Sequence, residues 1–241
     1  FYALVALSGL TMAIKQAANS PAITLSALAA TAVGSWLFVR RQNRLEDPLL
    51  TFDIFRSRLF TGGVLAAAGG MFVLAGAELM TTQKLQLVDA LTPLTAGATV
   101  AVMALSAIPA SVLGGAYLHK IGFLPLIAGG FAGAVVGAVA LVAGWTSIGM
   151  VLLGLSAGSV MSVSSIAIIG SAPMHRSGMA AGVEEVSYEL GTLITVALTG
   201  SLLQAGLDRG ADYTAAYNQV IGVLAAGAAC FAVATWWCFR D

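Results

Sequence analysis

Long apolar segments with almost no charge dominate this sequence. Of its 241 residues, 59% are hydrophobic and only 9% are charged, whereas about 25% of residues are charged in ordinary soluble domains. A water-exposed surface needs far more charge than this, so the composition excludes a soluble globular domain. It also excludes an intrinsically disordered chain and a small module held by disulfides. The sequence therefore predicts a polytopic membrane protein.

Eight segments are apolar enough to be interpreted as membrane spans, because a transmembrane helix needs about 20 predominantly apolar residues. None of them shows the two-residue alternation of a barrel strand, which leaves α-helices as the way to satisfy the backbone in lipid. We therefore predict an all-α integral membrane protein. The predicted spans are 1–14, 21–39, 59–82, 92–118, 123–143, 147–171, 178–207 and 215–239. The first lacks an initiator methionine and a charged leader, and we interpret it as the truncated end of a helix in a longer protein.

The basic residues indicate how these spans are oriented, since cytoplasmic loops are enriched in lysine and arginine. If successive spans alternate in direction, most basic residues lie on one side of the membrane. That side holds Arg40, Arg41, Arg44, Arg56, Arg58, Lys120, Arg176 and Arg240, and the other holds Lys15, Lys84 and Arg209. The richer side is expected to be cytoplasmic, which places the C-terminus inside the cell and the protein in the inner or plasma membrane.

The longest polar stretch, residues 41–58, divides the predicted spans into two groups. Residues 1–40 are expected to form two linker helices, and residues 59–241 a six-helix bundle, with a cytoplasmic linker between them. The apolar residues of the linker also fit an amphipathic helix in the membrane interface, and both interpretations stay open. These residues are Leu49, Leu50, Phe52, Ile54 and Phe55.

Three glutamates in the seventh span are the clearest candidates for function. Acidic side chains inside a membrane span are costly, and they mark ion or proton pathways by default. At about 100° per residue, Glu184, Glu185 and Glu189 share one side of the helix with Tyr188 and Thr192. Aliphatic residues occupy the opposite side. This pattern predicts a span that lines a polar cavity.

The depth of these carboxyl groups suggests a chemistry. At about 1.5 Å per residue from Gly178, Glu184 lies roughly 9 Å into the span and Glu189 roughly 16 Å, near the midplane of a hydrocarbon core about 30 Å thick. A carboxyl group at that depth can hold either a proton or a cation, which is the property that a proton-coupled carrier needs. Bonding to Arg176 or to loop backbone is the alternative, and it suits Glu184 best and Glu189 least.

Residues of other spans are candidates for the same cavity or for helix packing. Glu78, near the outer end of the third span, either lines the cavity or extends to the membrane interface. Met71 and Phe72 of that span are candidates for apolar contacts with a substrate. A stripe of small residues in the fifth span is typical of close helix packing. It consists of Gly129, Gly133 and Gly137.

Several classes of function lack support in the sequence. A net charge of zero gives no reason to expect a nucleic-acid partner. Neither His119 nor His175 has a further ligand at metal-binding spacing, so no metal site and no cofactor are expected. Residues 154–158 match G-x-S-x-G, but they lie in a predicted membrane helix instead of the strand–turn–helix that a hydrolase needs. We therefore expect a protein that is not an enzyme.

Three segments resemble the fourteen-helix drug:proton antiporters of the major facilitator superfamily, in particular the QacA/SmvA-type pumps. Residues 40–56, with RRQ at 40–42 and DPLL at 47–50, resemble the family's linker into its ninth helix. Residues 83–97, QKLQLV followed by LTPLTAG, resemble its turn between helices nine and ten. The most specific segment, residues 170–191, begins with GSAP and ends with EEVSYELG, and resembles its thirteenth helix. The resemblance covers nearly the whole chain and makes its spans helices seven to fourteen.

The resemblance implies a proton-coupled multidrug efflux antiporter for lipophilic and quaternary ammonium cations, with this chain as its C-terminal part. Pumps of this group use acids of the thirteenth helix, which implies cation binding or proton coupling for Glu184, Glu185 and Glu189. The implied partners are cationic drugs, protons, the lipid bilayer and an N-terminal helix bundle outside this chain. His119 replaces the aspartate of a superfamily loop, so no gating charge is expected there. Residues 92–118 lack the acid that some relatives carry in the tenth helix, which leaves the range of substrates open.

Two other functions fit the same spans. In a scaffold or assembly subunit, the glycine stripes would pack helices and an acid would pair with a partner's lysine or arginine. Three acids beside Tyr188 on one side exceed the single pairing charge that such a subunit needs. A nutrient symporter would share the fold, but these spans lack an internal cation and a polar-rich lining. A single bundle is not expected to transport alone, because alternating access needs a second bundle.

Overall fold

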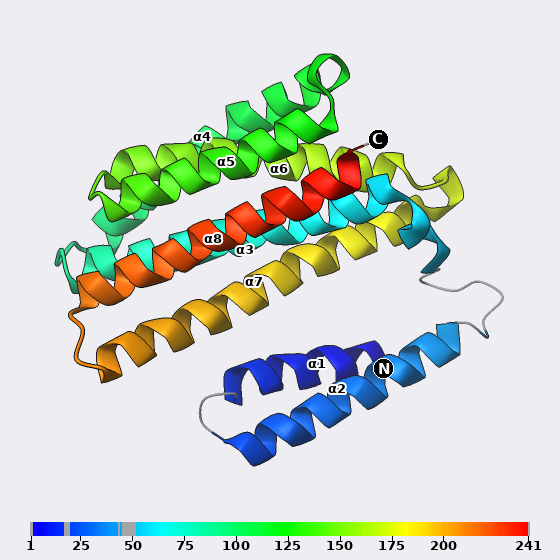
Figure 1. The fold of residues 1–241 in the computed structure, drawn as a ribbon, viewed down its shortest axis with the longest axis horizontal. Helices are drawn as coiled ribbons and strands as arrows, with labels where there is room; N and C mark the ends of the chain where they lie inside the picture. Colours follow the sequence, from blue (N-terminus) through cyan, green and yellow to red (C-terminus); the bar gives the residue numbers. More distant parts are fainter. Residues whose placement is uncertain (1, 17–19, 43, 45–51, 241) are drawn as a thin grey trace. The chain divides into compact units, whose positions relative to one another are not determined.

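The computed structural model describes residues 2–16, 20–42, 44 and 52–240, which are almost entirely helical (Figure 1). The elements are α1 (Tyr2–Gln16), α2 (Pro21–Gln42), the 3-10 turn η1 (Phe52–Arg56), α3 (Arg58–Leu87), α4 (Pro93–Ile121), α5 (Phe123–Val142), α6 (Thr146–Gly170), the 3-10 turn η2 (Met174–Arg176), α7 (Ser177–Asp208) and α8 (Tyr213–Phe239). Within this described part, seven helices are long and apolar enough to cross a membrane, and α1 is a shorter apolar helix. The prediction of an all-α membrane protein is confirmed.

The chain divides into two compact units, the first of which is Phe1–Ile54. Within it, α1 and α2 pack as an antiparallel hairpin. A Cβ on Gly34 of α2 would lie 2.8 Å from the backbone nitrogen of Ala6 in α1, so glycine allows this close approach. Of the predicted linker and its alternative interfacial helix, residues 43 and 45–51 lie outside the described residues.

The second unit, Phe55–Asp241, contains the six helices α3–α8. Helix α3 lies at its centre and packs against α6, α7 and α8, while α6 also packs against α4 and α5. Successive helices run in opposite directions, so α3, α5 and α7 begin at the same end of the bundle (Figure 1). Short connections between long helices produce this alternation.

Hydroxyl and carboxylate side chains define where three of these helices begin. The backbone N–H groups of the first turn have no partner within the helix, and a side-chain oxygen just before the helix accepts a hydrogen bond from one of them. Ser57, Thr92 and Asp212 do this for α3, α4 and α8. Each capping residue stands at the junction between a connection and an apolar span, so it marks where that span begins.

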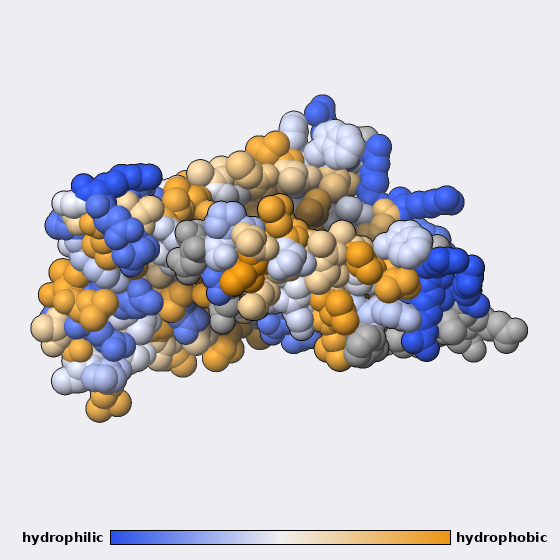
Figure 2. All heavy atoms as spheres, turned by 90° about the horizontal axis from the view of Figure 1, so that it is seen from below, coloured by the Kyte–Doolittle hydropathy of each residue, from blue (hydrophilic) through white to orange (hydrophobic). Residues whose placement is uncertain are grey.

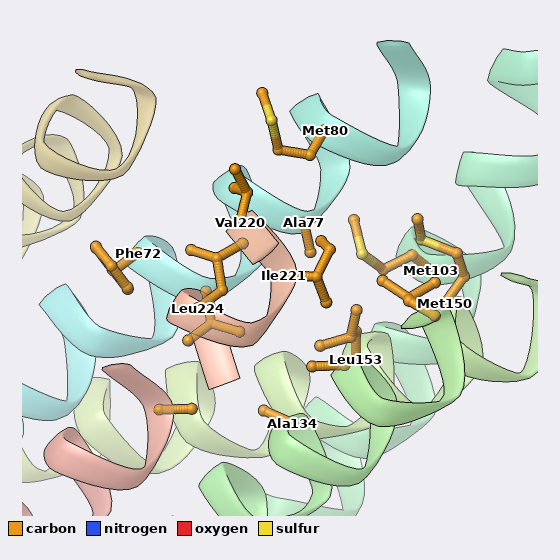
Figure 3. Packing of buried hydrophobic residues seen from close by; sticks show 14 of the residues in the cluster. Phe72, Ala77, Met80, Met103, Ala134, Met150, Leu153, Val220, Ile221 and Leu224 are labelled. Atoms are coloured by element: carbon orange, nitrogen blue, oxygen red, sulfur yellow. The ribbon is translucent and has the colours of Figure 1, made fainter. Parts of the chain in front are cut away.

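Large apolar side chains fill the interior of the six-helix unit. Tyr217, Phe131 and Met150 are each at most 1% exposed, although they come from three different helices. Figure 3 shows Ala77 of α3 and Ile221 of α8 within the same cluster. Lipid tails are as apolar as these side chains, so close packing and small residues hold such a bundle together.

Glycine residues of α6 allow α4 to approach closely. A Cβ on Gly154 would collide with the carbonyl group of Met103, and one on Gly158 would collide with that of Ala107. The Ser111 hydroxyl of α4 donates a hydrogen bond of 3.1 Å to the carbonyl oxygen of Gly158. The G-x-S-x-G sequence at this point is therefore a contact between two membrane helices.

The glycine stripe predicted in α5 lies partly at a helix contact. A Cβ on Gly133 would lie 2.6 Å from the Ser156 hydroxyl of α6, and one on Gly137 would lie 3.0 Å from a leucine of the same helix. Gly129 is exposed, and a Cβ there would have no neighbour within 4 Å. Its neighbour Gly130 faces α6 instead. The contact stripe of α5 is therefore Gly130, Gly133 and Gly137.

Strongly hydrophilic residues gather toward the ends of the helices, and apolar or small residues cover most of the surface between them (Figure 2). Where α3 begins and α8 ends, the Arg58 guanidinium lies 5.9 Å from the Trp237 ring, and that of Arg240 lies 4.8 Å from the Trp236 ring. Tryptophan beside arginine at helix ends is typical of the boundary between lipid and water.

Candidate functional site

Helix α7, which carries the three glutamates, packs on the bundle through a stripe of small and hydroxyl-bearing residues. Gly191 lies against the backbone of Ala68 and Phe72 in α3, and Thr195 lies against Gly76 of the same helix. The buried residues of α7 are Ala180, Ser187, Gly191, Thr195, Thr199, Leu203 and Gly206. Because small residues face α3, the helices come close together and the larger side chains of α7 project elsewhere.

When α7 is centred in the membrane, all three glutamates lie within the thickness of the hydrocarbon core. Residues 192 and 193 are the middle of Ser177–Asp208. At about 1.5 Å per residue, Glu189 lies about 5 Å from this midpoint and Glu184 about 13 Å from it. A core about 30 Å thick extends about 15 Å to each side. Glu189 is therefore close to the midplane, and Glu184 is close to the boundary at the end where α7 begins.

Glu184 is half-buried, and its carboxylate is engaged within the protein. The hydroxyl of Tyr188, one turn further along α7, donates a hydrogen bond of 2.8 Å to Glu184 Oε1. Ser164 of α6 is fully buried, and its hydroxyl donates a hydrogen bond of 3.0 Å to the carbonyl oxygen of Met161 in its own helix. The carboxylate of Glu184 is therefore engaged within α7 itself.

Glu185 and Glu189 differ from Glu184 because both are exposed on this chain. They lie about 100° and 140° around the helix from Glu184, whereas the buried stripe of α7 runs close to Glu184. Thr192 is half-buried beside them, and its hydroxyl donates a hydrogen bond of 3.0 Å to the carbonyl oxygen of Tyr188. Two carboxyl groups inside the span are thus accessible to a solute or to a neighbouring part of the protein.

No group of three or more histidine, cysteine, aspartate or glutamate side chains in the described ranges is arranged to hold a metal ion. The glutamates of α7 are spread along and around the helix instead of converging on one point.

Glu78 of α3 is also exposed, but it lies at a different depth. Gly191 is level with residues 68–72 of α3 and Thr195 is level with Gly76, so the two helices run parallel. Continuing this register places Glu78 level with about residue 197 of α7. It is therefore about 12 Å further along the bundle axis than Glu189, at about 1.5 Å per residue. The structure does not bring Glu78 next to the acids of α7.

The two apolar candidates of α3 lie in different environments. Met71 is half-buried, whereas Phe72 is only 7% exposed. The Phe72 ring lies 5.9 Å from the ring of Phe231 in α8, and a Cβ on Gly227 would meet it at 2.6 Å. Phe72 therefore packs α3 against α8, and Met71 is the more accessible of the two.

The predicted site residues do not include Ser164 of α6 or Thr195 of α7, both of which are fully buried. The Thr195 hydroxyl oxygen has no hydrogen-bond partner among the described residues, and it lies against the backbone of Gly76 in α3. Hydroxyl residues are common in membrane helices and usually bond to their own backbone. The sequence carries no signal for these two, because their roles depend on which helix lies opposite.

The fold and these residues define a multi-pass helical membrane protein with ionisable groups inside one span. The chain is 30% identical over 174 residues to Methyl viologen resistance protein SmvA of Salmonella typhimurium, covering 69% of this chain and 35% of that protein. It is 34% identical over 203 residues to Multidrug efflux pump LfrA of Mycolicibacterium smegmatis, covering 80% and 40%. It is 28% identical over 190 residues to Multidrug resistance protein Stp of Mycobacterium tuberculosis, covering 76% and 35%.

The chain therefore belongs to the drug efflux pumps of the major facilitator superfamily, and it matches their C-terminal part. The family predicted from the sequence is confirmed. The matched region spans about 35–40% of the length of these relatives. No family model matches the chain.

Proposed function

We propose that this chain is part of a proton-coupled antiporter that exports lipophilic and quaternary ammonium cations. The observation that carries the proposal is the pair of exposed carboxyl groups, Glu185 and Glu189, within the span of α7. The names of the relatives, which refer to multidrug efflux and to resistance to methyl viologen, support drugs as the substrate class. In this proposal, residues 1–40 are two linker helices, residues 41–58 are a cytoplasmic linker, and α3–α8 are one of two bundles.

The exchange rests on competition for the same carboxyl groups. An ionised Glu189 or Glu185 attracts a cation, and protonation of the acid releases it. The basic residues of α3–α8 stand at the helix ends, so the spans offer no internal cation to neutralise these acids. Rocking of one bundle against the other then exposes the site to each side of the membrane in turn. Tyr188 and Met71 supply aromatic and thioether contacts to the apolar parts of a drug.

The same proposal fixes the orientation of the protein in the inner or plasma membrane. Arg58, Lys120, Arg176 and Arg240 lie at the end of the bundle where α3 begins and α8 ends. That end is cytoplasmic by the positive-inside rule, so the C-terminus is inside. Glu184 and Glu185 are then closer to the cytoplasm than Glu189, and a drug from the cytoplasmic side meets them first.

The test uses the full-length protein in cells loaded with ethidium. Efflux is followed with and without a proton uncoupler, for the wild type and for Glu189→Gln and Glu185→Gln at matched expression. We expect the uncoupler and Glu189→Gln each to abolish efflux, because the amide can neither exchange a proton nor carry a charge. Asp208→Asn is the matched control, since Asp208 is exposed at the other end of α7 and bonds to Gln204 of its own helix.

The outcomes separate the function from the site. If the wild type exports neither ethidium nor another organic cation, the antiporter proposal is overturned. If both glutamine variants retain gradient-dependent efflux, the antiporter proposal holds, but Glu185 and Glu189 are not its coupling site.

A further inference from the structure

The phenol of Tyr188 is held by a carboxylate of its own helix. Its hydroxyl donates a hydrogen bond of 2.8 Å to Glu184 Oε1, one turn earlier in α7. A phenol without a hydrogen-bond partner can rotate about its side-chain bonds, whereas this hydrogen bond restrains the ring. The Tyr188 ring is therefore fixed relative to Glu184.

The three glutamates of α7 therefore fall into two kinds. Glu185 and Glu189 are exposed and turned away from the packed stripe, where they are open to a solute. Glu184 is half-buried beside that stripe and already accepts the hydrogen bond from Tyr188. A carboxylate that holds a neighbouring side chain does not need to touch the cation in order to affect its binding.

We propose that Glu184 is a positioning residue, which holds the Tyr188 ring as a fixed aromatic wall for an organic cation bound at Glu185 and Glu189. The proposal rests on the proposed function, because it assigns roles within the same site. An aromatic face attracts a cation through its quadrupole when the ring is correctly oriented. A fixed ring also favours binding because no side-chain motion has to be arrested when the cation arrives.

The experiment measures equilibrium binding to the purified full-length protein at one pH, so that it does not depend on transport. The probes are ethidium and tetraphenylphosphonium. We expect Tyr188→Phe and Glu184→Leu each to raise the Kd of both probes about fivefold, the effect of one lost hydrogen bond. Combining Tyr188→Phe with Glu184→Leu should raise the Kd no further than either change alone, since both remove the same hydrogen bond.

The variant Glu184→Gln distinguishes positioning of the Tyr188 ring from direct binding of the cation. Its amide oxygen still accepts the Tyr188 hydrogen bond, but it carries no charge. Glu184→Gln should therefore recover most of the affinity that Glu184→Leu loses, whereas Glu185→Gln and Glu189→Gln should both bind the probes weakly. In transport, Tyr188→Phe should raise KM with kcat within about twofold of the wild type, since the ring acts on cation binding.

Thr199→Val and Ser156→Ala are the matched controls, because each hydroxyl bonds to the backbone of its own helix. Wild-type affinity in Tyr188→Phe would overturn the proposal, and so would Glu184→Gln binding as weakly as Glu189→Gln. A wild-type protein that binds neither probe would overturn the proposed substrate class together with this proposal. If the wild type binds the probes and the variants bind them equally well, the positioning role of Glu184 alone is overturned.

Discussion

Gly191 of α7 lies directly against the carbonyl group of Ala68 in α3, with no side chain between the two helices. Four residues further along, the Thr195 hydroxyl lies against Gly76 of α3 in the same way. Weak Cα–H···O contacts recur at such close helix approaches. Because this contact consists largely of backbone, it fixes the rotation of α7 about its axis, and with it the directions of Glu185 and Glu189.

A side chain at position 191 should therefore destabilise the bundle. Gly191→Val places its Cβ against the Ala68 carbonyl group, and overpacking of this kind costs about 1–3 kcal/mol. The expected result is a lower unfolding temperature of the purified full-length protein. Gly200→Val on the exposed side of α7 is the control, because a Cβ there has no neighbour within 4 Å. An equal loss in both variants would show that the effect is helix propensity and not the contact with α3.

Much of this arrangement follows from sequence periodicity, but helix partners do not. The helical period correctly separates the aliphatic side of α7 from its acidic side. Whether a given acid on that side is packed or open depends on which helix lies next to it, as the contrast between Glu184 and Glu185 shows. The same holds for Met71 and Phe72, which are adjacent in sequence but differ in burial. Hydrophobicity alone gives no register between these helices, because apolar residues that face lipid and apolar residues that face another helix look alike in the sequence.

The contact between α4 and α6 should be as sensitive to added volume. Gly158→Val would drive a side chain into the backbone of Ala107, and we expect the protein to lose folded yield and thermal stability. Gly129→Val is the informative comparison, because Gly129 belongs to the most regular glycine pattern in the sequence but has open space around it. Fluorescence-detected size-exclusion chromatography, before and after heating, measures the folded yield and the thermal stability of each variant. A greater loss in Gly129→Val than in Gly158→Val would contradict the packing described here.

A buried hydrogen bond joins α3 to α8 near the other end of the bundle. The hydroxyl groups of Thr81 and Tyr217 are 3.0 Å apart, and both residues are at most 1% exposed. Tyr217→Phe leaves the Thr81 hydroxyl without this partner, so we expect a loss of about 1 kcal/mol in unfolding free energy. Tyr117→Phe, at an exposed tyrosine of α4, should change the unfolding temperature much less.

The coupling between the two residues gives a second measurement. Thr81→Val combined with Tyr217→Phe should cost less than the sum of the two single changes, because the double variant has no unpaired buried hydroxyl. Strict additivity would show that the two hydroxyl groups do not bond to each other.

The orientation proposed for the bundle predicts which loops react with a membrane-impermeant maleimide. Gly144, in the connection from α5 to α6, should be extracellular, and Lys120, at the end of α4, should be cytoplasmic. In a background without Cys230 and Cys238, Gly144→Cys should react in intact cells. Lys120→Cys should react only after the membrane is permeabilised. The reverse pattern would invert the orientation and place the C-terminus outside.

Glu78 and Glu189 should act independently in transport because they lie at different depths. Their axial separation of about 12 Å exceeds the distance of about 7–10 Å beyond which the effects of two substitutions usually add. We expect Glu189→Gln to abolish gradient-driven ethidium efflux, whereas Glu78→Gln should retain it and change only KM. With a weaker substitution at the deeper position, Glu189→Asp, the effects of Glu189→Asp and Glu78→Gln on kcat/KM should multiply. A double variant no worse than Glu189→Asp alone would show that the two acids share one site, and that the register between α3 and α7 changes during transport.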